Sequence, residues 1–256
     1  MLKYAVLGSG SCANAYIFQL EGFAFAIDNG FSCLEFLRRA RRLGFDPRRL
    51  SLIFLTHTHA DHLKGVETLS RRCRIPVVAH VDLPPYAFSA RGSQRVLPVQ
   101  PSREYLFEPL AITPFLTSHD APFSLGYHFR LGERRFTLIT DTGEVSEEMV
   151  AYAACSDVLF LEANYDPAML EAGGYPEFLK ERIRSTQGHL SNLAAISFLN
   201  RLSSNGRRRP ALVYFCHLSE NNNSPARLQE EIDRSLTWRG EYVICPRGAI
   251  QEGRPF

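Results

Sequence analysis

A dense cluster of metal-binding residue types follows directly after an apolar run. The run is Leu50-Ser51-Leu52-Ile53-Phe54-Leu55, which predicts a buried strand, and the cluster is His57-Thr58-His59-Ala60-Asp61-His62. Loops at the carboxyl ends of strands are where α/β proteins commonly build their sites. We therefore expect a site at the end of a strand in a sheet.

The cluster holds more donors than one ion can use. Imidazole and carboxylate groups are ligands that divalent zinc, manganese and iron favour. His57 and His59 form an H-x-H pair, which on an extended segment points both rings to the same side. Asp61 and His62 add a carboxylate and a third imidazole, too many for one tetrahedral ion but suited to two ions side by side. The motif predicts a site for two divalent ions, Zn or Mn.

Strand and helix patterns alternate along the chain. Predicted strands cover residues 2–7, 14–20, 23–28, 50–55, 77–79, 110–116, 124–131, 134–139, 157–162 and 211–216, and predicted helices cover 32–43, 146–154, 176–184, 190–203 and 225–236. No internal repeat or long linker interrupts this order, so residues 1–256 are expected to form a single domain. The pattern predicts an α/β fold of two packed sheets with helices on both outer faces.

Composition excludes several classes of protein. No stretch reaches the roughly 18 to 20 unbroken apolar residues of a membrane-spanning helix, and the apolar run at residues 4–7 is too short for a secretory signal. We therefore expect a cytoplasmic protein that does not bind membranes. The six cysteines form no C-x-x-C pair, which argues against a disulfide framework and a zinc ribbon.

The basic residues are almost all arginine. Of the 29 lysines and arginines only Lys3, Lys64 and Lys180 are lysine. Arginines cluster at positions 38, 39, 41 and 42, at 71, 72 and 74, and at 207–209. The planar guanidinium suits phosphate, but an arginine-rich solvated surface explains the same pattern. The net charge of +2 does not by itself require a polyanionic partner.

Isolated ligand candidates lie in loops after other predicted strands, at His119, Asp141 and His217. With the histidine motif they resemble the metallo-β-lactamase superfamily over essentially the whole chain. Longer segments resemble its YycJ/WalJ branch, regarded as 5′→3′ exonucleases of double-stranded DNA related to ribonuclease Z. These segments are Leu161–Asp166, Tyr175–Ile183, Gly188–Asn192 and His217–Asn222. Thr58 departs from the Glu expected in that branch, but a residue between two ligands is not itself a ligand.

This resemblance implies an αββα fold and a division of the ligands between two ions. One ion would be held by three imidazoles, those of His57, His59 and His119. The other would be held by Asp61, His62 and His217, and Asp141 would bridge the two ions. A water between two cations loses a proton near neutral pH and becomes the nucleophile, which Asp61 could orient.

The resemblance also assigns residues outside the metal shell. Asp28 would brace the histidine loop, although a turn aspartate after a strand fits its position equally well. Glu162 and His189 would form a pair in which His189 protonates the leaving oxygen and Glu162 holds its tautomer. The alternative is a helix-capping histidine beside a buried structural carboxylate.

The remaining motifs are expected to have structural rather than catalytic roles. His80 is expected to be solvent-facing or hydrogen-bonded, and His128 is an ordinary strand residue. The polar segment at residues 219–224 is expected to be a loop with a helix cap, with phosphate contact as the alternative. Tyr86 and Phe88 lie on a proline-stiffened segment and are expected to form a surface turn, although either ring could stack on a base.

The leading hypothesis for function is hydrolysis of phosphodiester bonds in nucleic acid. Within this class, the sequence most favours a 5′→3′ exonuclease of double-stranded DNA. An alternative keeps the site but changes the substrate to a small cyclic phosphodiester, a lactone or a thioester. A non-catalytic binding module is a third possibility, which the complete set of expected ligands disfavours.

Overall fold

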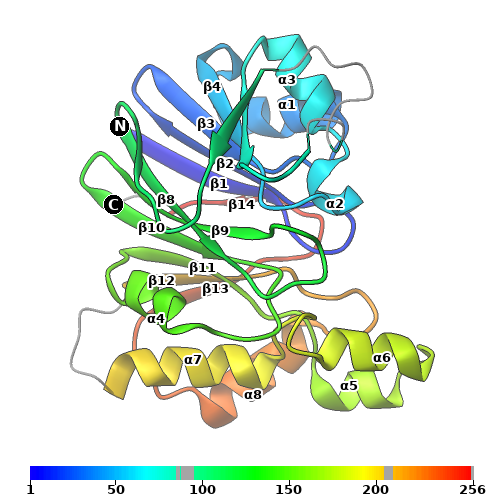
Figure 1. Ribbon diagram of the computed structural model, residues 1–256. Helices are drawn as coiled ribbons and strands as arrows, with labels where there is room; N and C mark the ends of the chain where they lie inside the picture. Colours follow the sequence, from blue (N-terminus) through cyan, green and yellow to red (C-terminus); the bar gives the residue numbers. More distant parts are fainter. Residues whose placement is uncertain (85–86, 88–94, 205–209, 255–256) are drawn as a thin grey trace.

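Two seven-stranded sheets lie face to face, and helices cover their outer faces (Figure 1). The computed structural model describes residues 1–84, 87, 95–204 and 210–254, so Tyr86, Phe88 and the arginines at 207–209 lie outside the described residues. The expected α/β fold with two packed, mixed sheets is confirmed. The single domain and the cytoplasmic location stay predictions.

Each sheet is antiparallel at one side and parallel at the other. The first runs in the order β14, β1, β2, β3, β4, β5 and β6, with the bounds Gln251–Glu252, Leu2–Gly8, Ala15–Leu20, Phe23–Ile27, Leu50–Phe54, Val77–His80 and Val96–Val99. The second runs in the order β13, β12, β11, β10, β9, β8 and β7, with the bounds Glu241–Ile244, Leu212–Cys216, Val158–Glu162, Arg134–Ile139, Leu125–Leu131, Leu110–Leu116 and Tyr105–Phe107. From β3 to β6 and from β10 to β13 all neighbours are parallel, so their carboxyl ends share a rim.

Aromatic side chains fill the space between the sheets. Along β2, Tyr16 and Phe18 face this central core, while Ile17 packs on the opposite face against the helices. Phe18 stacks on Phe25 with ring centroids 5.0 Å apart and meets Phe129 edge-on at 4.9 Å. Because both faces of the strand are buried, it appears in the sequence as a nearly continuous apolar run.

Helices close the outer faces and one end of the sheets. The helices α1, α2, α3, α4, α5, α6, α7 and α8 span Cys33–Arg42, Ala60–Leu63, Val66–Cys73, Glu147–Ala154, Pro167–Ala172, Glu177–Arg184, Asn192–Ser204 and Pro225–Ser235. In Figure 1, α1 and α3 cover the first sheet and α4, α7 and α8 the second, while α5 and α6 project at one end. Polar caps begin several of them, and Ser32 and Ser224 each accept a backbone N–H three residues on. None of the helices described is long and apolar enough to cross a membrane.

The predicted strands and helices are confirmed to within a few residues, but several short elements escaped prediction. The helices α2 and α5 and the strands β7 and β14 carry too few residues to show a periodic pattern. The helix α3 and the strands β6 and β13 escaped prediction although they are as long as α4 and β5, which were predicted. The strand β14 has two residues and pairs with β1 from the far end of the chain. Such pairing is decided by tertiary packing rather than by local propensity.

Replacing Phe18 by alanine is expected to lower the free energy of unfolding by about 3–5 kcal/mol, because a fully buried aromatic ring leaves a cavity. Guanidinium chloride unfolding measures this change. The control is Phe178→Ala on α6, where the side chain is 72% exposed and the expected change is within about 0.5 kcal/mol. Equal losses in the two variants would contradict the packing described.

Candidate dinuclear metal centre

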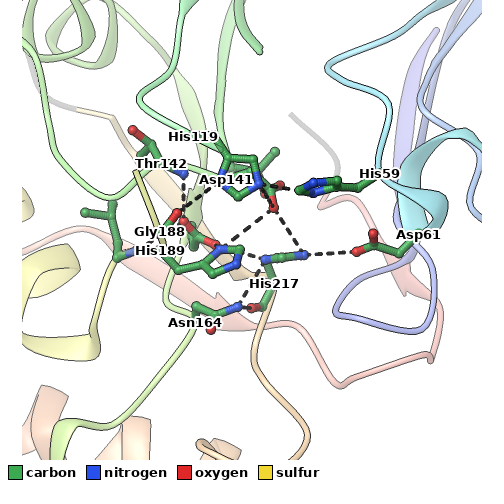
Figure 2. A network of polar contacts seen from close by, with 12 residues as sticks. His59, Asp61, His119, Asp141, Thr142, Asn164, Gly188, His189 and His217 are labelled. Carbon is green, nitrogen blue, oxygen red and sulfur yellow. Dashed lines mark hydrogen bonds and ion pairs between the residues drawn. The ribbon is translucent and has the colours of Figure 1, made fainter. Parts of the chain in front are cut away.

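The candidate ligands meet at one rim of the two sheets. His57, His59, Asp61 and His62 follow β4, while the other candidates follow β8, β10 and β12 of the opposite sheet. Figure 2 shows His59 and Asp61 approaching from one side and His119, Asp141 and His217 from the other. Residues more than a hundred positions apart thereby share one pocket, with a volume of about 310 Å³.

Among the described residues, four groups of donor atoms lie close enough together to hold an ion, and two of them have the membership that the family resemblance implies. One group is His57, His59 and His119, and the other is Asp61, His62 and His217; within each, the donor atoms lie within 4.8 Å of one another. Such sets of imidazole and carboxylate donors suit divalent metal ions.

Asp141 lies between the two groups. Its Oδ1 is 3.8 Å from Nε2 of His119 and 3.6 Å from Nε2 of His217, and its Oδ2 is 3.3 Å from Nε2 of His62. The carboxylate thus reaches imidazoles of both groups, which is the placement a bridging ligand needs.

The buried carboxylate of Asp28 determines which nitrogen of His62 faces the other donor atoms. Its Oδ2 lies 2.7 Å from Nδ1 of His62, and its Oδ1 accepts the backbone N–H of Thr56 at 2.8 Å. A carboxylate accepts only, so Nδ1 of His62 carries the hydrogen and Nε2 is left for the centre. Asp28 therefore braces the histidine loop, as the first interpretation of its motif expected.

The same carboxylate reaches His57 through a hydroxyl. Thr56 donates its O–H to Asp28 at 2.8 Å, so its oxygen is free to accept from Nδ1 of His57 at 3.0 Å. The Nε2 atom of His57 is buried and has no hydrogen-bond partner among the described residues. A buried, unpartnered acceptor is costly, and a bound cation at this point would satisfy it. This atom shows that the donor set fits a metal ion.

His119 and His59 complete the first group with opposite nitrogens. Nδ1 of His119 donates to the carbonyl of Gly188 at 3.0 Å, so Nε2 is the nitrogen that faces the other donors. That Nε2 lies 3.2 Å from Nδ1 of His59. His59 therefore presents Nδ1 to the centre, and its Nε2 lies 3.5 Å from Oδ1 of Asp120.

Glu162 contacts two histidines at once. Its Oε1 lies 2.7 Å from Nδ1 of His189 and 2.9 Å from Nδ1 of His217, while its Oε2 accepts the N–H groups of Thr142 and Leu190. The pair expected from the sequence is present, and the contact with His217 adds a second role. Glu162 turns Nε2 of His217 toward Asp61, 3.4 Å away.

Three residues that follow strands at this rim have a left-handed backbone conformation, which residues other than glycine rarely adopt. Asp28, Asp141 and His217 have φ values of 58°, 54° and 59°. The left-handed region costs a non-glycine residue roughly 1–2 kcal/mol. Backbone strain of this kind concentrates at functional sites, where surrounding hydrogen bonds hold it.

Burial and charge set the protonation states of the donors. Burial, with the neighbouring His62, holds the pKa of His57 well below its usual value. Burial disfavours charge on Asp61 as well, but the hydrogen bond to His217 and the charge of His62 outweigh it and lower the pKa of Asp61. For His62 the carboxylates of Asp141 and Asp28 overcome burial and raise its pKa to about 9, so metal binding there releases a proton.

Sequence reasoning missed Asn14, Asp120 and Arg182, which all lie at the centre. Asn14 is fully buried, and its Nδ2 lies 3.1 Å from Oδ2 of Asp61 and 2.9 Å from Nε2 of His62. Asp120 and Arg182 form an ion pair in the pocket. The Gly/Ser-rich stretch before Asn14 was a signal for a loop at a strand end. Arg182 lies in the segment Tyr175–Ile183 that resembles the YycJ/WalJ branch, but the sequence assigned it no role.

His80 and His128, for which the sequence predicted no catalytic role, belong to none of the donor groups described and do not line the pocket. Nδ1 of His80 accepts the backbone N–H of Asp82 at 3.1 Å, and the buried His80 ring stacks on Phe123. His128 contacts Thr137 at 2.8 Å through Nδ1. Burial, and to a lesser degree the charge of Arg135, lowers the pKa of His128 to about 4, so this ring is neutral at physiological pH.

The loop after His217 is largely structural. Asn223 donates to the carbonyl of Ala163 at 2.9 Å and Ser224 caps α8, as expected. Ser219 differs because it lines the pocket.

Replacing Asp28 by asparagine is expected to weaken metal binding about 10- to 100-fold. The two carboxylate oxygens accept hydrogen bonds from Thr56 and His62, and in asparagine one of them is replaced by an amide group that donates instead. Competition with a fluorescent chelator measures the affinity. The control is Asp157→Asn. Asp157 is a buried carboxylate just before the first residue of β11, at the end of that strand away from the centre, and it accepts the N–H of Arg135. That variant is expected to lose stability but keep its metal affinity. Unchanged affinity in Asp28→Asn would contradict the bracing role.

The chain is similar to known proteins over most of its length. The model of the beta-lactamase superfamily domain matches residues 25–218. Exodeoxyribonuclease WalJ of Streptococcus pneumoniae is 31% identical over 230 residues, 86% of this chain and 83% of that protein. Exodeoxyribonuclease YycJ of Bacillus anthracis is 29% identical over 251 residues, 93% of this chain and 90% of that protein.

The fold has counterparts among solved structures. The metallo-beta-lactamase fold protein YhfI from Bacillus subtilis superposes with a TM-score of 0.74 at 18% identity, covering 98% of this chain and 99% of that one. At this identity the similarity shows the fold alone.

Proposed function

Because this chain belongs to the beta-lactamase superfamily, in the family of the WalJ and YycJ exodeoxyribonucleases, we propose that it is a metal-dependent hydrolase of phosphodiester bonds in nucleic acid. We further propose 5′→3′ degradation of double-stranded DNA, with a site for two divalent ions, zinc or manganese. The observation that carries the proposal is the carboxylate of Asp141, within 3.8 Å of Nε2 atoms in both donor groups. The arrangement suits two ions side by side.

The proposed ligands are those expected from the sequence. His57, His59 and His119 would hold one ion, Asp61, His62 and His217 the other, and Asp141 would bridge them. When bound, two divalent ions supply a nucleophilic water near neutral pH and neutralise the charge that develops on the phosphate. Imidazole and carboxylate donors suit both zinc and manganese, so availability decides between them.

The protein's own groups act on both sides of the phosphate. Asp61 is ionised, is partly exposed to the pocket and lies 3.1 Å from the amide of Asn14, so it can accept a hydrogen bond from the attacking water and orient it. Nδ1 of His189 is held by Glu162 at 2.7 Å, so its Nε2 is the atom available to the substrate in the pocket. A protonated His189 can therefore pass the Nε2 proton to the leaving oxygen, while Glu162 stabilises the charged ring.

The purified protein with added Mn²⁺ or Zn²⁺ is expected to degrade 5′-phosphorylated duplex DNA. A label on the 5′ end should appear in mononucleotides before a label on the 3′ end does. A chelator is expected to abolish cleavage, and restoring the metal ion should recover it, because the donor set by itself offers no nucleophile.

Parallel assays separate the alternatives. Single-stranded DNA, RNA, bis(p-nitrophenyl) phosphate and a lactone are tested under the same conditions. Hydrolysis of the small substrates with every nucleic acid left intact would replace the nuclease by a small-molecule hydrolase. Activity that survives complete removal of metal would contradict the metal-dependent mechanism.

A further inference from the structure

One wall of the pocket comes from α6 and the segment just before it. Tyr175, Leu179, Arg182 and Ile183 line this wall. Among the described residues that line the pocket, Arg182 is the only arginine or lysine. Carboxylates supply most of the other charge, at Asp61, Asp120 and Asp141.

Arg182 is held close to the first donor group. Its Nε donates to Oδ2 of Asp120. The other oxygen of Asp120 lies 3.4 Å from Nε2 of His119 and 3.5 Å from Nε2 of His59. A single carboxylate therefore separates the guanidinium from the candidate metal ligands.

The terminal nitrogens of Arg182 remain available. A guanidinium has five N–H donors, and the bond to Asp120 uses the one on Nε. In the part of the chain that the structure describes, the two Nη groups meet no acceptor, and 54% of the side chain is exposed. The ion pair thus orients the planar fork without occupying it.

We propose that Arg182 binds the phosphate next to the scissile one through Nη1 and Nη2, and so favours nucleic acid over diesters with a single phosphate. This inference rests on the proposed function. A polyanionic strand that enters the pocket would bring a second phosphate near the wall where Asp61, Asp120 and Arg182 lie, and ions held by the donor groups would neutralise the reacting phosphate rather than this one. The guanidinium fork matches two phosphate oxygens, and its bond to Asp120 reduces the orientational freedom lost on binding.

Replacing Arg182 by alanine is expected to raise KM for duplex DNA about tenfold or more, with a smaller change in kcat. The ratio of kcat/KM for DNA to kcat/KM for bis(p-nitrophenyl) phosphate should fall by a similar factor, since the small diester offers no second phosphate. Arg182→Lys should recover part of the loss, because it keeps the charge but not the fork. The matched control is Arg184→Ala on the same helix, where the side chain is 40% exposed and pairs with Glu171 and Glu177, and this variant should keep the ratio.

Neutral methylphosphonate linkages locate the contact. One such linkage is placed at each position beside the scissile phosphate in turn. At one position it should raise KM for the wild-type protein, and at that position it should have little effect on KM for Arg182→Ala. Equal values of kcat/KM on DNA for Arg182→Ala and Arg184→Ala would overturn the inference. So would an equal loss of kcat/KM on DNA and on bis(p-nitrophenyl) phosphate in Arg182→Ala. A wild-type protein that cleaves no nucleic acid would instead overturn the proposed function.

Discussion

Replacing Asp141 by asparagine is expected to lower DNA cleavage at least about a thousandfold and to reduce the bound metal. The side chain keeps its shape and loses its charge, and one of its oxygens becomes an amide that cannot ligate. Metal ions contribute several kcal/mol to stabilising a phosphoryl transition state, which corresponds to about this loss of rate. Asparagine is chosen because position 141 has a φ of 54°, a conformation that asparagine tolerates better than alanine.

Elemental analysis and the nuclease assay measure the two effects together. The control is Asp233→Asn, an exposed aspartate on α8 that accepts from Gln229 and should leave metal content and rate unchanged. If Asp141→Asn keeps both its metal and its activity, Asp141 does not bridge the ions. If it loses the activity and keeps both ions, the carboxylate acts on the substrate rather than on the metals.

Replacing His189 by alanine is expected to slow DNA cleavage about 10²- to 10⁴-fold while the metal content stays constant, because a general acid contributes this much. The loss should shrink for a thymidine monophosphate ester with a p-nitrophenyl leaving group, since that oxygen departs without a proton. Single-turnover kinetics on both substrates measure the difference. The control is Gln187→Ala, an exposed residue of the same loop.

The metal content distinguishes this role from another that the geometry permits. His189 also forms a donor group with Asp141, Glu162 and His217, within 4.8 Å of one another. Loss of metal in His189→Ala would therefore make the ring a ligand. An equal loss of rate on both substrates, with the metal retained, would contradict proton donation.

Local sequence predicted the order of the main elements because their patterns are strong. The helix at Cys33–Arg42 has a serine cap and a spaced apolar face, and β4 is an apolar run of ordinary strand length. The strand β14 has two residues, too few for such a pattern, and its position depends on β1 at the far end of the chain.

The candidate ligands could be named from the sequence because their residue types are chemically distinctive. Three histidines and an aspartate within six positions have few structural explanations, and His119, Asp141 and His217 each follow a predicted strand. Arg182 carried no such signal, because an arginine on an amphipathic helix usually faces solvent. Its place in the pocket follows from where α6 projects and from the ion pair with Asp120.

The histidine motif therefore determined by itself the chemistry of the centre: imidazole and carboxylate donors, too many for one ion, at the end of a buried strand. Only the tertiary structure decided which nitrogen each ring presents. Asp28 turns Nε2 of His57 and His62 toward the other donor atoms, whereas His59 presents Nδ1. A tautomer is set by the acceptor that meets the other nitrogen, and that acceptor comes from a strand or loop distant in sequence.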